Sequence, residues 1–352
     1  MDKTAGPNYN GHVEKNRVLT ISSAIVAIFI VGLVMRLAKS VLFPFCLAIF
    51  FYFVLSPVLD LLTRKLKLPR TLALVVVILF TFLVLYLMGL LFYSSGETFA
   101  AEIPKYGQKF SRMVESVQVQ LNLPKSKLDP LAWLQGLDIQ KVGSFFLTSV
   151  GTVMSFLATL FLVLIFLVFM LAGRGKLYAK IKASFEAKNA AHLTRIVENI
   201  DRQVQKYLAL KTVSCIISGV LATLVMVIFG LNFAVLFGFL TFLLNYIPNI
   251  GALIAKVLPF LFALLQFDSA WPAIWMFIIL FVIDAFMGVV AEPKMMGQGL
   301  GLSPLAILFA LFFWGWLWGI PGMILSVPMM VILKVVCANV PGLKFMEALL
   351  SK

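Results

Sequence analysis

The sequence predicts an all-α integral membrane protein, a multispan helical bundle, on three observations. Of its 352 residues, 62% are hydrophobic and only 12% are charged, whereas about a quarter of the residues in a soluble domain are charged. Apolar runs near the roughly 20 residues that a spanning helix needs recur along the chain. Two further apolar regions are interrupted by a turn containing proline and glycine, which predicts two helical hairpins.

Six apolar runs are predicted to span the bilayer as helices, because a bilayer offers no water to unpaired backbone groups. They are 18–35, 41–62, 71–93, 145–172, 207–231 and 272–291. The polar residues 1–17 precede the first run, and no small-residue cleavage site follows it. We therefore expect the first run to be retained as a spanning helix.

Basic residues in the connecting segments predict the orientation. They gather in 63–70 and in 173–206, while 94–144 is nearly balanced in charge. Because cytoplasmic loops carry the excess of lysine and arginine, the first two segments and both termini are expected in the cytoplasm of a bacterial inner-membrane protein. The predicted organisation is a cytoplasmic tail 1–17, three spans in 18–93, a periplasmic helical segment 94–144, a span 145–172, a cytoplasmic amphipathic helix 173–206 continuing into the next span, a region 207–337 with spans and two hairpins, and a cytoplasmic tail 338–352.

Several function classes are disfavoured by composition. The net charge of +14 lies in short basic runs between apolar segments, so membrane lipid rather than nucleic acid is the expected partner. The cysteines at 46, 215 and 337 form no CxxC pair and are expected to pack without a disulfide or metal. The two histidines lie in polar segments, and neither HExxH, GxSxG nor a Walker motif occurs. We expect neither enzymatic activity nor a cofactor.

The two hairpins are predicted to enter the membrane from opposite sides. Region 233–267 is interrupted at 245–251, and region 303–337 at 319–322, which leaves arms of about 14–18 residues. Span followed by hairpin thus occurs twice in opposite orientation, an inverted repeat that points to a transporter's binding site. Fully spanning arms would leave both termini on the same side, so topology alone does not decide between the two arrangements.

The last hundred residues resemble a known family. The motifs are Asn-Tyr-Ile-Pro-Asn-Ile-Gly at 245–251, Glu-Pro-Lys-Met-Met-Gly-Gln-Gly-Leu-Gly-Leu-Ser-Pro at 292–304, Phe-Trp-Gly-Trp-Leu-Trp-Gly at 313–319 and Leu-Ser-Val-Pro at 325–328. They resemble the autoinducer-2 exporter (AI-2E) family, most closely its quorum-signal transporter branch. The resemblance covers almost the whole chain and implies an inner-membrane exporter or permease. It implies autoinducer-2 as the solute for some members, cation/proton antiport for others, and homo-oligomers such as pentamers.

Four polar residues within apolar segments are candidates for binding a solute or an ion. Asp284 and Lys256 each place a charge where it costs several kcal/mol unless it is paired, hydrated or neutralised. They are interpreted as a proton, cation or solute site, with a static ion pair as the alternative. Asn245 and Asn249 flank Pro248, where amides can bind a hydroxylated solute or cap the hairpin turn.

A set of proline, glycine and charged residues is predicted to act as gate or hinge. Its members lie at the helix breaks and at the inner end of the sixth span, and they are Pro248, Gly251, Glu292, Gly297, Gly299, Gly301, Pro321 and Gly322. The alternative is an ordinary interfacial loop in which glycine permits close packing. Trp314, Trp316 and Trp318 are expected as interface anchors or as a stacking surface, and Lys211 and Lys334 as snorkelling side chains without a role.

These observations together predict a transporter that exports a small polar solute, autoinducer-2 by resemblance, through alternating access. The first alternative is a sodium (lithium)/proton antiporter in which Asp284 carries the ion. The second is a non-transporting membrane scaffold, which the two opposed hairpins disfavour.

Overall fold

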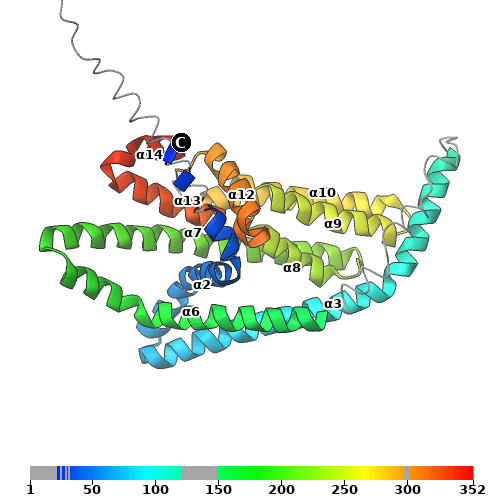
Figure 1. Cartoon of the computed structure of the whole chain (residues 1–352). Coiled ribbons are helices and arrows are strands. Elements are labelled where there is room, and N and C mark those ends of the chain that lie inside the picture. The colour runs from blue at the N-terminus through cyan, green and yellow to red at the C-terminus, as the bar shows by residue number, and fades with distance from the viewer. Residues whose placement is uncertain are drawn as a thin grey trace, which may run out of the picture.

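The computed structural model describes residues 22–23, 26–27, 30, 32–120, 149–296 and 301–351. Within these residues the ordered elements are helices, and no β-strand occurs (Figure 1). The helices are α2 (Lys39–Arg64), α3 (Arg70–Gln120), α6 (Ser149–Ser184), α7 (Ala187–Ile228), α8 (Ala234–Leu244), α9 (Ile250–Gln266), α10 (Ala270–Phe286), a π-helix (Met287–Ala291), α11 (Glu292–Met296), α12 (Pro304–Trp318), α13 (Ile320–Asn339), a short 3-10 turn (Pro341–Leu343) and α14 (Lys344–Leu350). The all-α prediction is confirmed.

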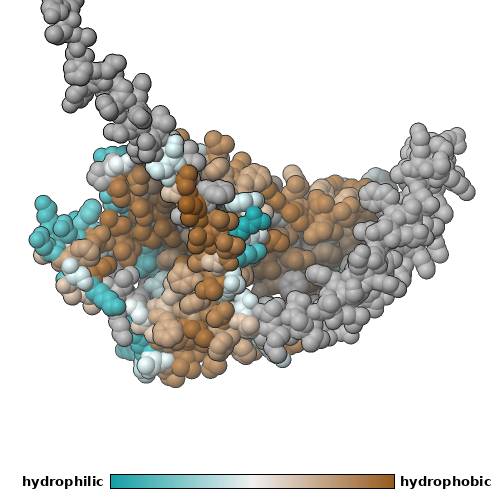
Figure 2. Space-filling view, in the orientation of Figure 1, coloured by the Kyte–Doolittle hydropathy of each residue, from teal (hydrophilic) through white to brown (hydrophobic). Residues whose placement is uncertain are grey.

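Several helices are long and apolar enough to cross a membrane. Among the described residues they are Lys39–Arg64, Arg70–Leu91, Ala187–Ile228, Ala270–Met295 and Gly322–Asn339. The first four fall on predicted spans, and the fifth is the second arm of the second predicted hairpin. α6 covers residues 149–172 of the predicted run 145–172, and half of the run 18–35 lies outside the described residues. The visible surface is mainly hydrophobic over the helices, and hydrophilic residues gather where α6 meets α7 (Figure 2). The chain is therefore a multi-pass membrane protein.

Two helical segments differ from their predicted boundaries. α3 continues without interruption from its membrane span into the segment predicted as a separate helix, and its 51 residues extend about 75 Å. The predicted helix 173–206 is instead divided, because Glu186 has an extended backbone (φ −56°, ψ 148°) between α6 and α7. No proline or glycine marks this break. The chain reverses here as α6 and α7 pack against α2 (Figure 1).

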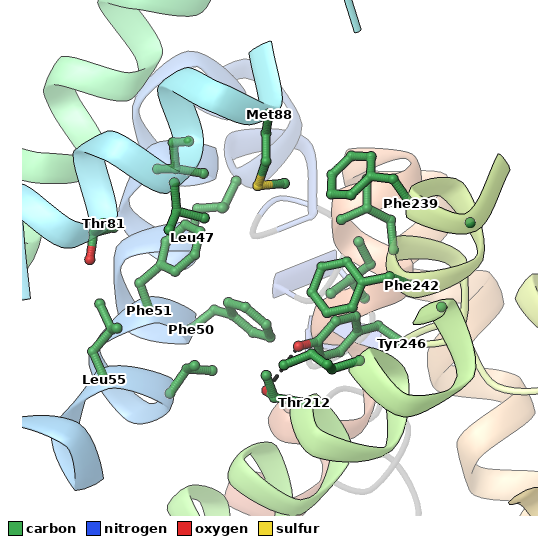
Figure 3. Close-up of a pocket in the computed structure, with 18 of the residues that line it drawn as sticks. Leu47, Phe50, Phe51, Leu55, Thr81, Met88, Thr212, Phe239, Phe242 and Tyr246 are labelled. Atoms are coloured by element: carbon green, nitrogen blue, oxygen red, sulfur yellow. Dashed lines mark hydrogen bonds between the residues drawn. The ribbon is translucent and has the colours of Figure 1, made fainter. Parts of the chain in front are cut away.

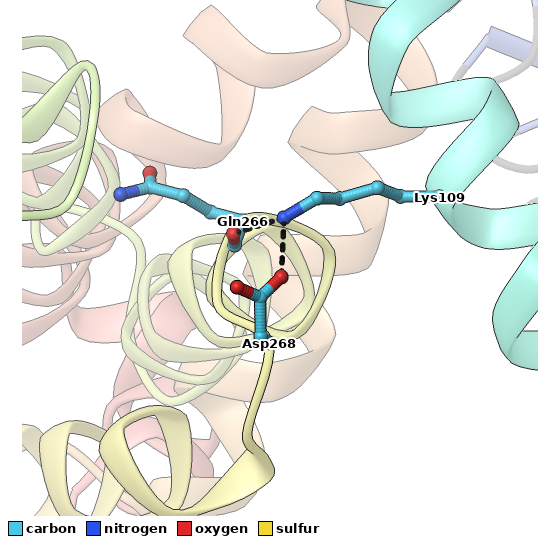
Figure 4. Close-up of polar contacts among 3 residues, drawn as sticks. All are labelled: Lys109, Gln266 and Asp268. Carbon is cyan, nitrogen blue, oxygen red and sulfur yellow. Dashed lines mark hydrogen bonds and ion pairs between the residues drawn. The ribbon is translucent and has the colours of Figure 1, made fainter.

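The far end of α3 is attached to the ends of the helices that follow α7. The Lys109 ammonium donates to the Gln266 carbonyl at 2.8 Å and forms an ion pair with Asp268 at 3.0 Å (Figure 4). One turn earlier, Tyr106 is buried against Phe262, with 4.8 Å between the ring centroids. α3 thus connects the start of the bundle to the α8–α10 group at one end of the molecule.

α7 is shared by two hydrophobic cores. Leu208 belongs to the core that joins α7 to α2, α6 and α13, whereas Ala222 belongs to the core that α7 forms with α8, α9 and α10. Between these two positions, α7 carries the polar residues Lys211, Ser214 and Ser218. A polar site is therefore positioned between the two cores.

Candidate functional site

The first helix break contains a strained residue and an obligatory glycine. The chain turns within 245–249, and Asn249 has φ +60° and ψ −57°, the strained geometry of a γ-turn, which the Ile250 N–H closes by donating to the Pro248 carbonyl at 2.6 Å. A Cβ atom on Gly251 would lie 1.8 Å from the Leu244 carbonyl oxygen. Glycine is thus required because the two arms of the hairpin approach each other closely.

The second helix break is even shorter. Gly319 alone separates α12 from α13, with φ +73° and ψ −148°. Pro321 occupies the first turn of α13, where its missing N–H costs nothing. A Cβ atom on Gly322 would lie 1.9 Å from the Trp314 carbonyl oxygen. Both predicted breaks are confirmed, and their action as hinges stays a prediction.

The two charges predicted within apolar helices form an ion pair. The Lys256 ammonium on α9 contacts the Asp284 carboxylate on α10. The lysine side chain is 11% exposed and the aspartate side chain 30% exposed. The ammonium also lies 5.3 Å from the centre of the Phe281 ring, where a cation is attracted to the aromatic face. The structure therefore brings together two residues that lie 28 positions apart.

A second charged group was not predicted as a unit. Lys211 and Ser214 on α7 both donate to the same Glu292 carboxylate oxygen, at 2.6 Å and 2.7 Å. The position of Lys211 near the end of an apolar run predicted no role for it. Its spacing of three residues from Ser214 places both on one face of α7, and this was the available signal.

A π-helix lies between the two carboxylates. Asp284 and Glu292 are eight residues apart, which in a regular α-helix would offset their side chains by about 80° around the axis. The π-helix Met287–Ala291 has wider turns, so each residue rotates the chain less. This reduces the offset, and both carboxylates line the same cavity. π-helical turns are often found at functional sites.

These polar groups surround a cavity of about 630 Å³, here called the polar cavity. Its walls come from α7, both hairpins and the α10–α11 run, and the residues that line it include Lys211, Ser218, Asn245, Pro248, Asn249, Lys256, Asp284, Gly288, Glu292, Gly301, Ile307 and Val327. Most of the predicted site residues thus meet at one place. Gly251, Pro321 and Gly322 instead lie in the hairpin turns, and Gly297 and Gly299 lie outside the described residues.

Gly301, another residue of the predicted gate, is held by a hydrogen bond from a lysine. Gly301 has φ +59°, and its carbonyl accepts a hydrogen bond from Lys334 at 2.8 Å. This contact ties the chain before α12 to α13, so Lys334 has a structural partner that its position in the sequence did not predict.

The three tryptophans occupy different environments. Trp318 is buried, and its indole N–H donates to the Met35 carbonyl at 3.4 Å. Trp314 packs beside it with 5.0 Å between the ring centroids. Trp316 is 63% exposed and lies under the Arg36 guanidinium. Trp318 and Trp314 therefore serve packing, and Trp316 as an interface anchor stays a prediction.

The polar cavity has chemistry suited to an uncharged or zwitterionic molecule. Its two lysines and two carboxylates cancel, and each charge has a partner of opposite sign. Asn245 and Asn249 add amide donors and acceptors without adding charge. The arrangement can form hydrogen bonds with a small polar solute inside an otherwise apolar bundle. A multi-pass helical bundle with such a cavity between broken helices is typical of membrane transport proteins.

Comparison with known proteins identifies the family within this class. Residues 23–342 match the model of the AI-2E family transporters, so the chain belongs to that family. It is 31% identical to the AI-2 transport protein TqsA of Escherichia coli K12 over 344 residues, which cover 95% of each chain. It is 32% identical to the putative transport protein YhhT of the same organism, covering 85% of this chain and 84% of YhhT. A putative transport protein of Haemophilus influenzae is 30% identical, covering 90% of this chain and 92% of the relative.

Family membership decides between classes of function. AI-2E family members are transport proteins and not enzymes, so the chain is a transport protein of the bacterial inner membrane. Family membership thereby disfavours the alternative of a non-transporting membrane scaffold.

Proposed function

We propose that the protein exports a small polar solute of the autoinducer-2 type by alternating access through the polar cavity. The observation that carries the proposal is the cavity itself, about 630 Å³ in volume and lined in part by two ion pairs and two asparagines, between two broken hairpins in an apolar bundle. Irregular backbone at membrane depth is tolerated where it lines such a cavity. The name of TqsA supports autoinducer-2 as the first solute to test.

In the proposed mechanism both hairpins are re-entrant and enter from opposite sides. For the first hairpin, the 11 residues of α8 extend only about 16 Å, which is short of the roughly 30 Å hydrocarbon core. In the second hairpin the 20 residues of α13 are long enough to span, so its re-entrant arrangement is proposed from the inverted repeat. Side chains at both breaks are buried in part, since Tyr246 and Ile247 are 6% and 3% exposed and Trp318 is 2% exposed, whereas Ile320 is 60% exposed. A turn at the membrane surface would be expected to expose such side chains. Both chain termini are then cytoplasmic, as the basic segments predict.

Cysteine labelling of intact cells tests this topology. A variant without the three native cysteines receives one cysteine at Ile320, beside the second turn. A fully spanning α12 would place that residue in the periplasm, where an impermeant maleimide reaches it, whereas a re-entrant turn is protected. Asp268, 97% exposed in the proposed outer loop, provides the labelled control. Equal labelling at both positions would refute the re-entrant arrangement.

Within the cavity, we assign solute binding to the amides and to the Lys256–Asp284 pair. Asn245 is buried at the end of α8, so its amide has a defined position, and Asn249 faces the cavity from the other side of the turn. The pair can lend a donor and an acceptor to the solute without an unpaired charge. Glu292 and the glycines that follow it are proposed to form the inner gate.

Release of autoinducer-2 from cells tests the function. Cells with the protein should release the signal faster than cells without it, and Asn245→Ala should reduce the gain at least fivefold. Asn339→Ala serves as the matched control, because Asn339 lies at the end of α13 and donates to the Val335 carbonyl outside the cavity. Equal release with and without the protein would exclude autoinducer-2 while leaving the fold intact.

A second candidate function is sodium or lithium exchange for protons at Asp284. It is favoured by one observation, a carboxylate that remains 30% exposed beside the polar cavity although it is paired. A strain lacking the gene should then become sensitive to lithium, and Asp284→Asn should not restore growth. Full restoration by Asp284→Asn would exclude this exchange. Assembly into homo-oligomers is proposed from the family resemblance alone.

A further inference from the structure

A second large cavity lies on the other side of the first helix break. Its volume is about 670 Å³, and we call it the apolar cavity. Figure 3 shows Leu47, Phe50, Phe51, Leu55 and Met88 facing Phe239 and Phe242 across the space. The walls come from α2 and α3 on one side and from α7 and α8 on the other, with α13 contributing Leu325. The proposed transport function does not use this space.

The hydroxyl groups that line the apolar cavity are already occupied. Thr81, Thr212 and Thr223 each donate to the carbonyl four residues earlier on their own helix, at 2.7 to 2.8 Å. Tyr246 donates to the Thr212 hydroxyl at 2.8 Å. A buried water needs two to four polar partners, and apolar cavities without them stay dry or take an apolar ligand. The cavity is therefore suited to hydrocarbon and not to water or to a polar solute.

The apolar cavity is continuous with the surface that faces the bilayer. Phe80 on α3 and Val235 on α8 line it and are 56% and 54% exposed. The span Arg70–Leu91 of α3 is buried inside the bundle over only 11% of its most apolar window. Leu79 and Leu83, on the same span, are likewise more than half exposed. Acyl chains of the surrounding bilayer thus have direct access to the opening.

We propose that the apolar cavity is a binding site for one acyl chain of a membrane phospholipid. The chain enters between α3 and α8 and packs against the aromatic side chains of α2 and α8. Its inner end reaches Tyr246, which is buried and lies 5.5 Å from Phe50 in an edge-to-face contact. The chain comes from the bilayer, which is itself apolar, so the binding free energy is supplied by the van der Waals contacts that fill the apolar cavity.

The position of this site couples it to the polar cavity. Tyr246 faces the apolar cavity while its neighbour Asn245 faces the polar one, and on α7 the same division holds for Thr212 and Lys211. The two cavities are therefore separated by a wall about one residue thick, closed by the Tyr246–Thr212 hydrogen bond. A bound acyl chain supports this wall and stabilises the first hairpin turn.

Native mass spectrometry of the full protein, extracted from membranes in mild detergent, tests the proposal. Val84→Trp fills the cavity from α3, and Val235→Trp fills it independently from α8. Val76→Trp is the matched control, because Val76 is exposed on the same span as Val84 but does not line the cavity. The thermal transition of each variant is measured alongside, to verify folding.

The proposal predicts one phospholipid per chain on the wild type and on Val76→Trp, and at least tenfold lower occupancy on both filling variants. Equal phospholipid on all four proteins, or none on the wild type, would overturn it. A changed number of subunits in the filling variants, with lipid unchanged, would also overturn it and assign this face to a second copy of the chain. Autoinducer-2 release is not part of this readout, so the two proposals fail independently.

Discussion

Removing one partner of the Lys256–Asp284 pair should destabilise the protein more than removing both. Lys256→Met keeps most of the side-chain volume but leaves the Asp284 carboxylate without its cation. Breaking a buried pair in this way costs about 3–5 kcal/mol. Since the carboxylate is 30% exposed at the polar cavity, water compensates in part, and we expect a loss of about 2–3 kcal/mol in the free energy of unfolding.

The double variant Lys256→Met with Asp284→Asn leaves no unpaired charge. Its free energy of unfolding should lie within about 1 kcal/mol of the wild type, because replacing a buried pair by neutral groups is often close to neutral. The single Asp284→Asn variant should fall between, since the ammonium keeps its contact with the Phe281 ring. The coupling energy of the cycle, which is the sum of the two single losses minus the loss in the double variant, is then about 3 kcal/mol.

Equilibrium unfolding of the purified protein in a titration with dodecyl sulfate measures all four free energies. Additive losses in the two single variants, without coupling, would refute the reasoning. Measuring transport in the same proteins separates structure from function. If the double variant is stable but no longer transports, the charges of the wild type are needed for transport. If it transports fully, the ion pair of the wild type is only structural.

Three further predictions follow from single contacts. Gly251→Ala should prevent stable folding, because its Cβ would lie 1.8 Å from a backbone carbonyl oxygen of α8. Gly173→Ala should be tolerated, because its Cβ would have no such atom within 4 Å. Expression level and melting temperature distinguish the two variants. Tyr106→Ala should lower the free energy of unfolding by about 3 kcal/mol, as the truncation of a buried aromatic side chain to alanine does. Lys109→Ala should lower it by less than about 1 kcal/mol, since the partner Asp268 is exposed. Equal losses would contradict this ranking. Lys211→Met should cost about 2 kcal/mol by leaving its carboxylate partner unpaired, and Lys211→Arg should restore most of it in the same titration.

Much of the secondary structure could be predicted because its causes are local. Spans such as 41–62 and 272–291 follow from length and hydropathy, since a bilayer admits no unpaired backbone. The two breaks follow from proline and glycine, which change the backbone wherever they occur. The division at Glu186 could not be predicted in this way, because no residue there disfavours a helix and the packing of α6 and α7 decides it.

The candidate site likewise has features that the sequence determines and features that only the packing of helices determines. By itself the sequence determined that charges at Lys256 and Asp284 need an unusual environment, because an isolated charge in an apolar helix is costly wherever it points. Only the tertiary structure decided that they meet each other, that Lys211 meets Glu292, and that a π-helix turns both carboxylates toward one space. Those outcomes depend on how distant helices pack and rotate, and the spacing of residues along one helix shows which of them share a face but not which helix that face will meet.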